Sequence, residues 1–163
     1  MQVLSMEALY GGKICAALDR QHPRDLYDIY ILLNNEGLTE KIRHAFIVYL
    51  LSHNRPISEL LDPNLKPDLE ETYKETFEGM AFDPVKLDDL TDAWHQIVKQ
   101  LHNQFTEREK EFILSFLSPS PKGELFPLAN VKELPAIQWK LLNIGKMSKN
   151  KRKKAIEKLE KVL

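Results

Sequence analysis

The sequence predicts an all-α protein, and two observations carry this prediction. Apolar residues recur at spacings of three and four along most of the 163 residues, and no alternating strand pattern of useful length occurs. N-capping residues, prolines and glycines divide the periodic segments into lengths typical of globular helices. A hydrophobic content of 43% is sufficient for a core, and the length favours one domain. We therefore expect a compact multi-helix domain.

The first two helices meet at a proline. Ser5 is a suitable N-cap for a helix that runs to about Arg20. Pro23 suits the first turn of a second helix, which ends between Asn34 and Gly37. On the first helix one face carries Leu9, Lys13, Ala16, Ala17 and Arg20. The opposite face carries Ile14, Cys15 and Leu18, which we expect in the core.

Three further helices are predicted in the middle of the chain. Thr39 begins one that runs to His53 and is stopped by Pro56, and short turns follow around Pro63 and Pro67. Its inward side chains are Ile42, Phe46, Tyr49 and Leu50. A second helix runs from Asp68 through Phe77 to Gly79, and a third begins at Asp88. The buried face of this third helix comprises Leu90, Trp94, Ile97, Val98, Leu101 and Phe105.

The last part of the chain contains a break. Thr106 and Glu109 form a capping box for a helix that ends near residue 117. Pro and Ser residues then mark a linker, and helix resumes at Pro135. We therefore predict a helical domain over residues 1–117, a loop or linker over 118–134, and C-terminal helices over 135–163 that pack on the same domain.

The charge is divided unevenly. Residues 1–145 hold 15 Lys and Arg against 22 Asp and Glu, a net charge of −7, whereas residues 146–163 hold 8 against 2, a net charge of +6. The basic tail contains Lys149, Lys151, Arg152, Lys153 and Lys154. These residues are candidates for contact with RNA phosphates, although docking on the acidic body or plain solvation is favoured because no aromatic residue lies between them.

Several kinds of chemistry are disfavoured. The single cysteine, Cys15, allows no disulfide within the chain, which suits a cytoplasmic protein, and its apolar neighbours favour burial over reactivity. The five histidines form no pair at metal-ligand spacing, so no metal site is predicted. No apolar run approaches the ~20 residues that a membrane-spanning helix needs.

A dense group of charges lies where the first two helices join. This charged corner consists of Lys13, Asp19, Arg20, Arg24, Asp25 and Asp28. Lys13 and Arg20 share one helix face, seven residues apart, with small alanines between them, which leaves room for a phosphate chain. The same charges are equally consistent with a salt-bridge network that holds the helix-loop-helix junction together.

The run from Leu9 to Asp28, LYGGKICAALDRQHPRDLYD, resembles a conserved block of the AbiEii/AbiGii nucleotidyltransferase toxins of type IV toxin-antitoxin systems, which act in abortive infection and phage defence. The block has a lysine, then an arginine, then Arg-Asp-x-x-Asp. The resemblance implies that Lys13 binds nucleotide phosphates, and that Arg20 and Arg24 bind them too or form ion pairs at the site. It further implies that Asp25 and Asp28 are acidic residues of the catalytic site.

The family's nucleotidyl transfer also uses a Gly-Ser turn with paired carboxylates that hold Mg²⁺ against a nucleoside triphosphate. No Gly-Ser dipeptide occurs in this sequence. We therefore expect the helical C-terminal part of such a toxin, inactive alone, as a truncated product, a dissected domain or half of a split pair. The alternative is a noncatalytic interaction module whose charged corner is structural.

Partners follow from the same reasoning. The resemblance implies a cognate antitoxin, a missing nucleotidyltransferase half and an RNA substrate, and nothing suggests a membrane. Loss of an N-terminal half would expose an apolar surface around Leu4, Leu9, Ile31 and Leu32, which predicts self-association.

Overall fold

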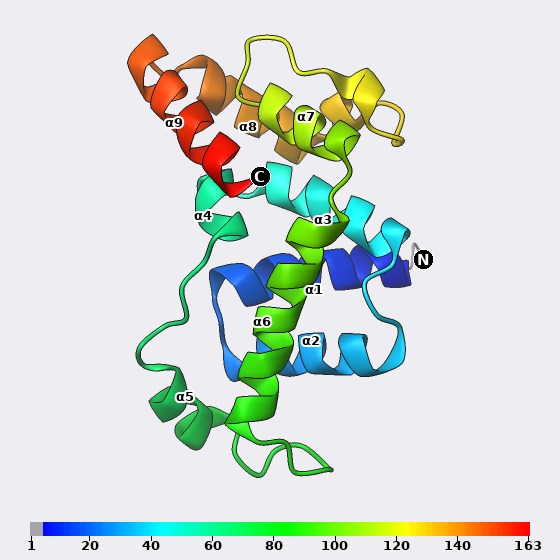
Figure 1. Cartoon of the computed structure of the whole chain (residues 1–163), viewed down its shortest axis with the longest axis vertical. Helices are drawn as coiled ribbons and strands as arrows, with labels where there is room; N and C mark the ends of the chain where they lie inside the picture. Colours follow the sequence, from blue (N-terminus) through cyan, green and yellow to red (C-terminus); the bar gives the residue numbers. More distant parts are fainter. Residues whose placement is uncertain (1–4) are drawn as a thin grey trace. The chain divides into compact units, whose positions relative to one another are not determined.

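A computed structural model describes residues 5–163 and confirms the all-α fold (Figure 1). This part of the chain forms nine α-helices and two short 3₁₀-helices and contains no strand. The α-helices are α1 (Met6–Asp19), α2 (Pro23–Asn35), α3 (Glu40–Ser52), α4 (Ile57–Leu61), α5 (Leu69–Thr76), α6 (Leu87–Gln104), α7 (Glu107–Ser115), α8 (Pro135–Gly145) and α9 (Lys149–Val162). The 3₁₀-helices are η1 (Gly123–Leu125) and η2 (Val131–Glu133).

The chain forms two compact units. Unit 1 comprises Met1–Phe46 and Pro63–Asn103, and unit 2 comprises Ile47–Asp62 and Gln104–Leu163. The division of the sequence into residues 1–117, 118–134 and 135–163 stays a prediction.

Unit 1 is built around α1 and α2, which pack against each other, with α5 packed against α2. The Ser5 hydroxyl accepts a hydrogen bond from the Ala8 amide at 3.2 Å and caps α1 as predicted. The indole Nε1 of Trp94 on α6 donates to the Ala17 carbonyl of α1 at 3.1 Å inside the core. The fully buried side chains of this unit include Ile14, Leu18, Leu26, Ile29, Leu32, Leu90 and Ile97.

The core of unit 2 is aromatic. Phe112 of α7 stacks on Phe126, with ring centroids 4.6 Å apart, and meets Phe116 edge to face. The capping box of α7 forms as predicted, with the Thr106 hydroxyl accepting from the Glu109 amide and the Glu109 carboxylate accepting from the Thr106 amide. Helix α9 packs against α4 and α7, and Leu159 is its one fully buried side chain.

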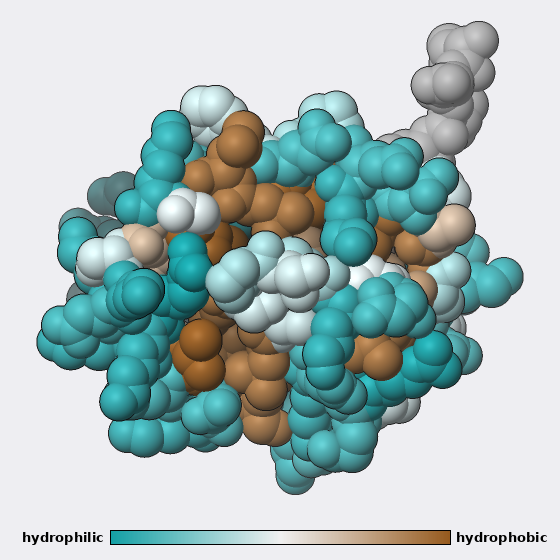
Figure 2. Space-filling model, turned by 90° about the horizontal axis from the view of Figure 1, so that it is seen from above, coloured by the Kyte–Doolittle hydropathy of each residue, from teal (hydrophilic) through white to brown (hydrophobic). Residues whose placement is uncertain are grey.

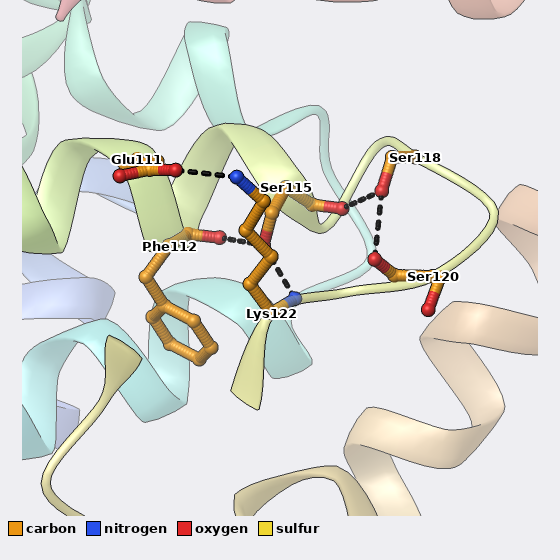
Figure 3. A network of polar contacts seen from close by, with 6 residues as sticks. All are labelled: Glu111, Phe112, Ser115, Ser118, Ser120 and Lys122. Carbon is orange, nitrogen blue, oxygen red and sulfur yellow. Dashed lines mark hydrogen bonds and ion pairs between the residues drawn. The ribbon is translucent and has the colours of Figure 1, made fainter. Parts of the chain in front are cut away.

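The segment after α7 is tied back to that helix (Figure 3). The Ser115 hydroxyl donates to the Phe112 carbonyl and accepts from the Lys122 amide at 3.0 Å. The Ser118 hydroxyl donates to the carbonyls of Ser115 and Ser120. The Lys122 ammonium pairs with Glu111. The Ser-Pro segment that the sequence suggests as a linker is therefore held by side-chain hydrogen bonds at its base.

Three local predictions were wrong. Residues 57–61 form helix α4 where only turns were expected, because Ile57, Leu60 and Leu61 have helical spacing and are all buried. Tyr49 was assigned to the inward face of α3 but its side chain is 36% exposed. Leu32 was placed on an exposed apolar surface, yet it is completely buried in unit 1.

Candidate nucleotide-binding corner

The charged corner lies in unit 1, at the junction of α1 and α2. Helix α1 ends at Asp19, and α2 begins at Pro23, whose ring fixes the backbone for a first helical turn. Gln21, between the two helices, has a φ of 52°, in the left-handed region that few residues other than glycine adopt. This conformation reverses the chain within three residues and brings the end of α1 to the start of α2.

Gln21 also anchors the junction, a role that sequence reasoning missed. Its side chain is buried, its amide nitrogen donates to the Asn64 carbonyl, and its amide oxygen accepts from the Lys66 backbone, both at 2.8 Å. The Gln21 side chain thus ties the backbone of residues 64–66 to the junction of α1 and α2. A polar residue in a charged run gives no periodic signal, so the sequence offered no means of finding this contact.

His22 caps the second helix. Its Nδ1 accepts a hydrogen bond from the Arg24 amide at 3.2 Å, and its Nε2 lies 3.3 Å from the Thr76 hydroxyl of α5. The imidazole therefore links the start of α2 to α5 and fixes the direction in which the first turn of α2 presents its charged side chains.

Two ion pairs cross the junction. The Lys13 ammonium on α1 pairs with Asp28 on α2 at 2.5 Å, and the Arg20 guanidinium pairs with Asp25 at 2.7 Å. Lys13 and Asp28 are each about one-third exposed, at 31% and 33%. The Arg20 side chain is 65% exposed, so most of it faces solvent although one guanidinium nitrogen is bound. The structure thus brings together four of the predicted site residues.

Asp25 is the most enclosed member of the corner. Its side chain is 12% exposed, and only Oδ1 meets a partner. The second oxygen, Oδ2, is buried and accepts no hydrogen bond from the part of the chain that the structure describes. A buried carboxylate oxygen without a donor is costly, so Oδ2 is an acceptor that favours an additional donor.

Among the cations of the corner, Arg24 is the one without an ion pair in the described residues. It is exposed, and its Nη2 lies 3.5 Å from the Met80 sulfur in the loop between α5 and α6. Within residues 5–163 no carboxylate pairs with it. Arg24 therefore carries a positive charge at the rim of the corner that no ion pair neutralises.

The described residues contain no reactive thiol, metal-binding cluster or membrane-spanning helix. Cys15 is buried, and burial together with the charge of Asp19 raises the pKa of its thiol to about 12, which keeps it protonated and unreactive. No cluster of three His, Cys, Asp or Glu side chains in residues 5–163 could hold a metal ion. None of the helices in this range is long and apolar enough to cross a bilayer.

The basic tail forms α9, in unit 2. Lys149, Lys151, Lys153 and Lys154 are exposed, and Lys153 lies 3.9 Å from Glu157. Arg152 differs from them because it is half-buried and its Nη2 donates to the Ile144 carbonyl at the end of α8, at 3.0 Å. Arg152 thus has a contact inside the protein, whereas the four lysines face solvent.

The surface proposed for self-association is smaller than expected. Leu9 is 45% exposed and Ile31 is half-buried, but Leu32 is in the core, and Leu4 lies outside the described residues. An apolar surface that spans all four positions is therefore not present.

Comparison with known proteins matches the charged corner to a family. A family model described as "Nucleotidyl transferase AbiEii toxin, Type IV TA system" matches residues 1–115. The search of curated proteins and the search of solved structures each returned no match. Because the matched range covers well over half of the chain, the protein belongs to the AbiEii family of nucleotidyl transferase toxins of type IV toxin-antitoxin systems.

Proposed function

We propose that the charged corner is the helical side of a nucleotide-binding site, in which Lys13, Arg20 and Arg24 bind the phosphates of a nucleoside triphosphate. The observation that carries the proposal is the incomplete pairing of the corner. Arg24 lacks a carboxylate partner among residues 5–163, and Arg20 is 65% exposed. Guanidinium groups with free donors suit phosphate oxygens, since each presents several N–H groups in one plane.

Asp25 and Asp28 are the acidic residues of this site. Asp28 holds the Lys13 ammonium, and Asp25 holds Arg20 through Oδ1. The unpartnered Oδ2 of Asp25 leaves one acceptor for a substrate hydroxyl, a water or a group from another polypeptide. Both carboxylates therefore position cations for phosphate contact, and Asp25 keeps an acceptor for the ligand.

A Mg²⁺ ion is implied for nucleotidyl transfer but does not fit these residues alone. The described residues contain no group of three side chains that could hold a metal, and the sequence lacks a Gly-Ser turn. Paired carboxylates from outside the described residues would have to supply the metal ligands. Accordingly the proposed role of this chain is nucleotide binding rather than metal chemistry.

Further partners follow from the family. A cognate antitoxin is implied by the type IV system, and an RNA substrate would meet exposed cations such as Lys149, Lys151, Lys153 and Lys154. Because Arg152 donates to the Ile144 carbonyl, we assign it to the structure of unit 2 rather than to RNA contact.

The alternative function is a noncatalytic interaction module in which the corner is purely structural. The two ion pairs favour this alternative, since Lys13 of α1 and Arg20, which follows α1, each meet a carboxylate of α2. The two functions differ in whether the cations of the corner bind phosphate, and a substitution of Lys13 can measure this difference.

Replacing Lys13 by methionine is expected to remove nucleotide binding with little effect on stability. The Lys13–Asp28 pair is one-third exposed, and pairs of this kind contribute about 1 kcal/mol or less. Thermal unfolding of both proteins with and without each nucleoside triphosphate, at low and high salt, gives both quantities. The wild type is expected to be stabilised by nucleotide, less so as salt rises, and Lys13→Met not at all.

A matched control for this substitution is Lys74→Met. Lys74 forms an exposed ion pair with Glu70 at 2.6 Å in the same unit, and it lies outside the charged corner. This variant should bind nucleotide as the wild type does. If nucleotide instead stabilises neither the wild type nor Lys13→Met, the corner is structural.

The chain by itself is expected to transfer no nucleotide. Without paired carboxylates, the described residues cannot hold the Mg²⁺ ions that nucleotidyl transfer uses to stabilise the developing charge on a triphosphate. The test supplies Mg²⁺, RNA and each of the four labelled nucleoside triphosphates, and measures label on the RNA. Labelling that disappears in a Lys13→Ala variant would show that the chain is a complete enzyme.

A further inference from the structure

An apolar pocket of about 310 Å³ lies within unit 2, between α4, α8 and α9. This volume is at the lower end of the range of roughly 300–1,000 Å³ typical of small-molecule sites. Its wall is formed chiefly by apolar side chains, among them Ile57, Leu117, Ile144, Met147, Ala155 and Leu159. The family model ends at residue 115, so most of this wall lies outside the matched region. The pocket is not part of the charged corner.

Lys140 is the one charged residue that lines this pocket. Its ammonium donates to the carbonyls of His53 and Arg55, at 2.5 and 2.9 Å, on either side of Asn54, which also lines the pocket. Within the described residues no carboxylate pairs with Lys140. Burial lowers the pKa of its ammonium, with no opposing contribution from an acidic neighbour. Two of its three N–H donors are used, and the third remains for an anionic group.

The pocket is covered on one side by a helix with few core contacts. Helix α9 lines the pocket with Ala155 and Leu159, and Leu159 is its only fully buried side chain. Figure 2 shows the molecule from above the view of Figure 1, with hydrophobic residues exposed between hydrophilic ones. An apolar ligand below α9 would add contacts that the helix lacks, so ligand binding should stabilise the folded protein.

We propose that this pocket binds a small monocarboxylate with an apolar body, the size of a medium-chain fatty acid. The apolar wall would take the hydrocarbon part, and the ammonium of Lys140 would bind the carboxylate. A half-buried ammonium without a carboxylate partner gains an ion pair from such a ligand, whereas a neutral ligand of the same shape gains only apolar burial. The proposal does not depend on nucleotide binding at the charged corner.

Octanoate is a suitable probe, with 1-octanol as its uncharged counterpart. We expect calorimetric titration of the whole chain to show saturable binding of octanoate, with a dissociation constant below about 1 mM and at least tenfold weaker binding of 1-octanol. The midpoint of thermal unfolding should rise with octanoate concentration. In Lys140→Met the two ligands should bind equally weakly, because the charge that distinguishes them is absent.

Two further variants separate the pocket from general effects of charge and folding. Lys146→Met removes an exposed lysine that directly follows α8 and does not line the pocket, and octanoate should still bind. Ala155→Leu fills the pocket from α9 and should abolish binding of both ligands while the circular dichroism spectrum stays unchanged. Absence of octanoate binding to the wild type would overturn the proposal, as would equal binding by Lys140→Met or Ala155→Leu.

Discussion

Replacing Gly11 by alanine is expected to lower the free energy of unfolding by about 1–3 kcal/mol, even though alanine is the better helix former. A Cβ atom at Gly11 would lie 2.7 Å from the Ala45 carbonyl carbon and from the Phe46 amide nitrogen of α3. Backbone atoms cannot turn aside as a flexible side chain can. Helices α1 and α3 would have to move apart, and Lys13 on the next half-turn would move with α1.

The control for this prediction is Gly145→Ala. Gly145 is also in an α-helix, but apart from its chain neighbours and the backbone of its own helix no atom lies within 4 Å of the position that its Cβ would take. There the gain in helix propensity acts alone, and the variant should be more stable by up to about 1 kcal/mol. Chemical denaturation of the two variants and the wild type measures both values. A Gly11→Ala protein as stable as Gly145→Ala would show that α1 and α3 do not approach this closely.

The periodic parts of the fold were predictable from the sequence, and the reasons are local. Ser5 and Thr106 cap the helices that they were expected to cap. Helix α4 was missed because its five residues lie between prolines, and three apolar residues at helical spacing are too few to distinguish one helical turn from a loop. The exposure of Tyr49 depends on how α3 is covered by other elements, which helical spacing does not specify.

The sequence predicted which residues lie in the charged corner, but it did not predict which of them form ion pairs with each other. Spacing placed Lys13 and Arg20 on one helix face, and the family match includes the whole corner. Which carboxylate meets which cation depends on the angle between α1 and α2, and that angle is set by the conformation of residues 20–22. The left-handed backbone of Gln21 has no signature in the sequence, since glycine or asparagine is the usual choice for such a position.

Replacing Gln21 by alanine is therefore expected to have the largest effect, a loss of about 2–4 kcal/mol in the free energy of unfolding. The side chain satisfies two backbone groups, the Asn64 carbonyl and the Lys66 amide. A buried polar group left without its partner costs about 1–3 kcal/mol, and water can replace part of each bond because these contacts are partly buried. Equilibrium denaturation measures the loss, with Gln96→Ala, an exposed glutamine of α6 in the same unit, as the control.

The substitution of Gln21 also tests how the corner is organised. Once its anchor is removed, residues 20–22 are free to adopt other conformations, so the Arg20–Asp25 pair should form less often and nucleotide binding should weaken together with stability. A Gln21→Gly variant separates the two effects, because glycine restores the left-handed backbone but not the hydrogen bonds. If Gln21→Gly binds nucleotide as well as the wild type while remaining less stable, the backbone turn alone positions the cations. If both variants lose binding equally, the side-chain anchor to residues 64–66 is what holds the corner in its binding geometry.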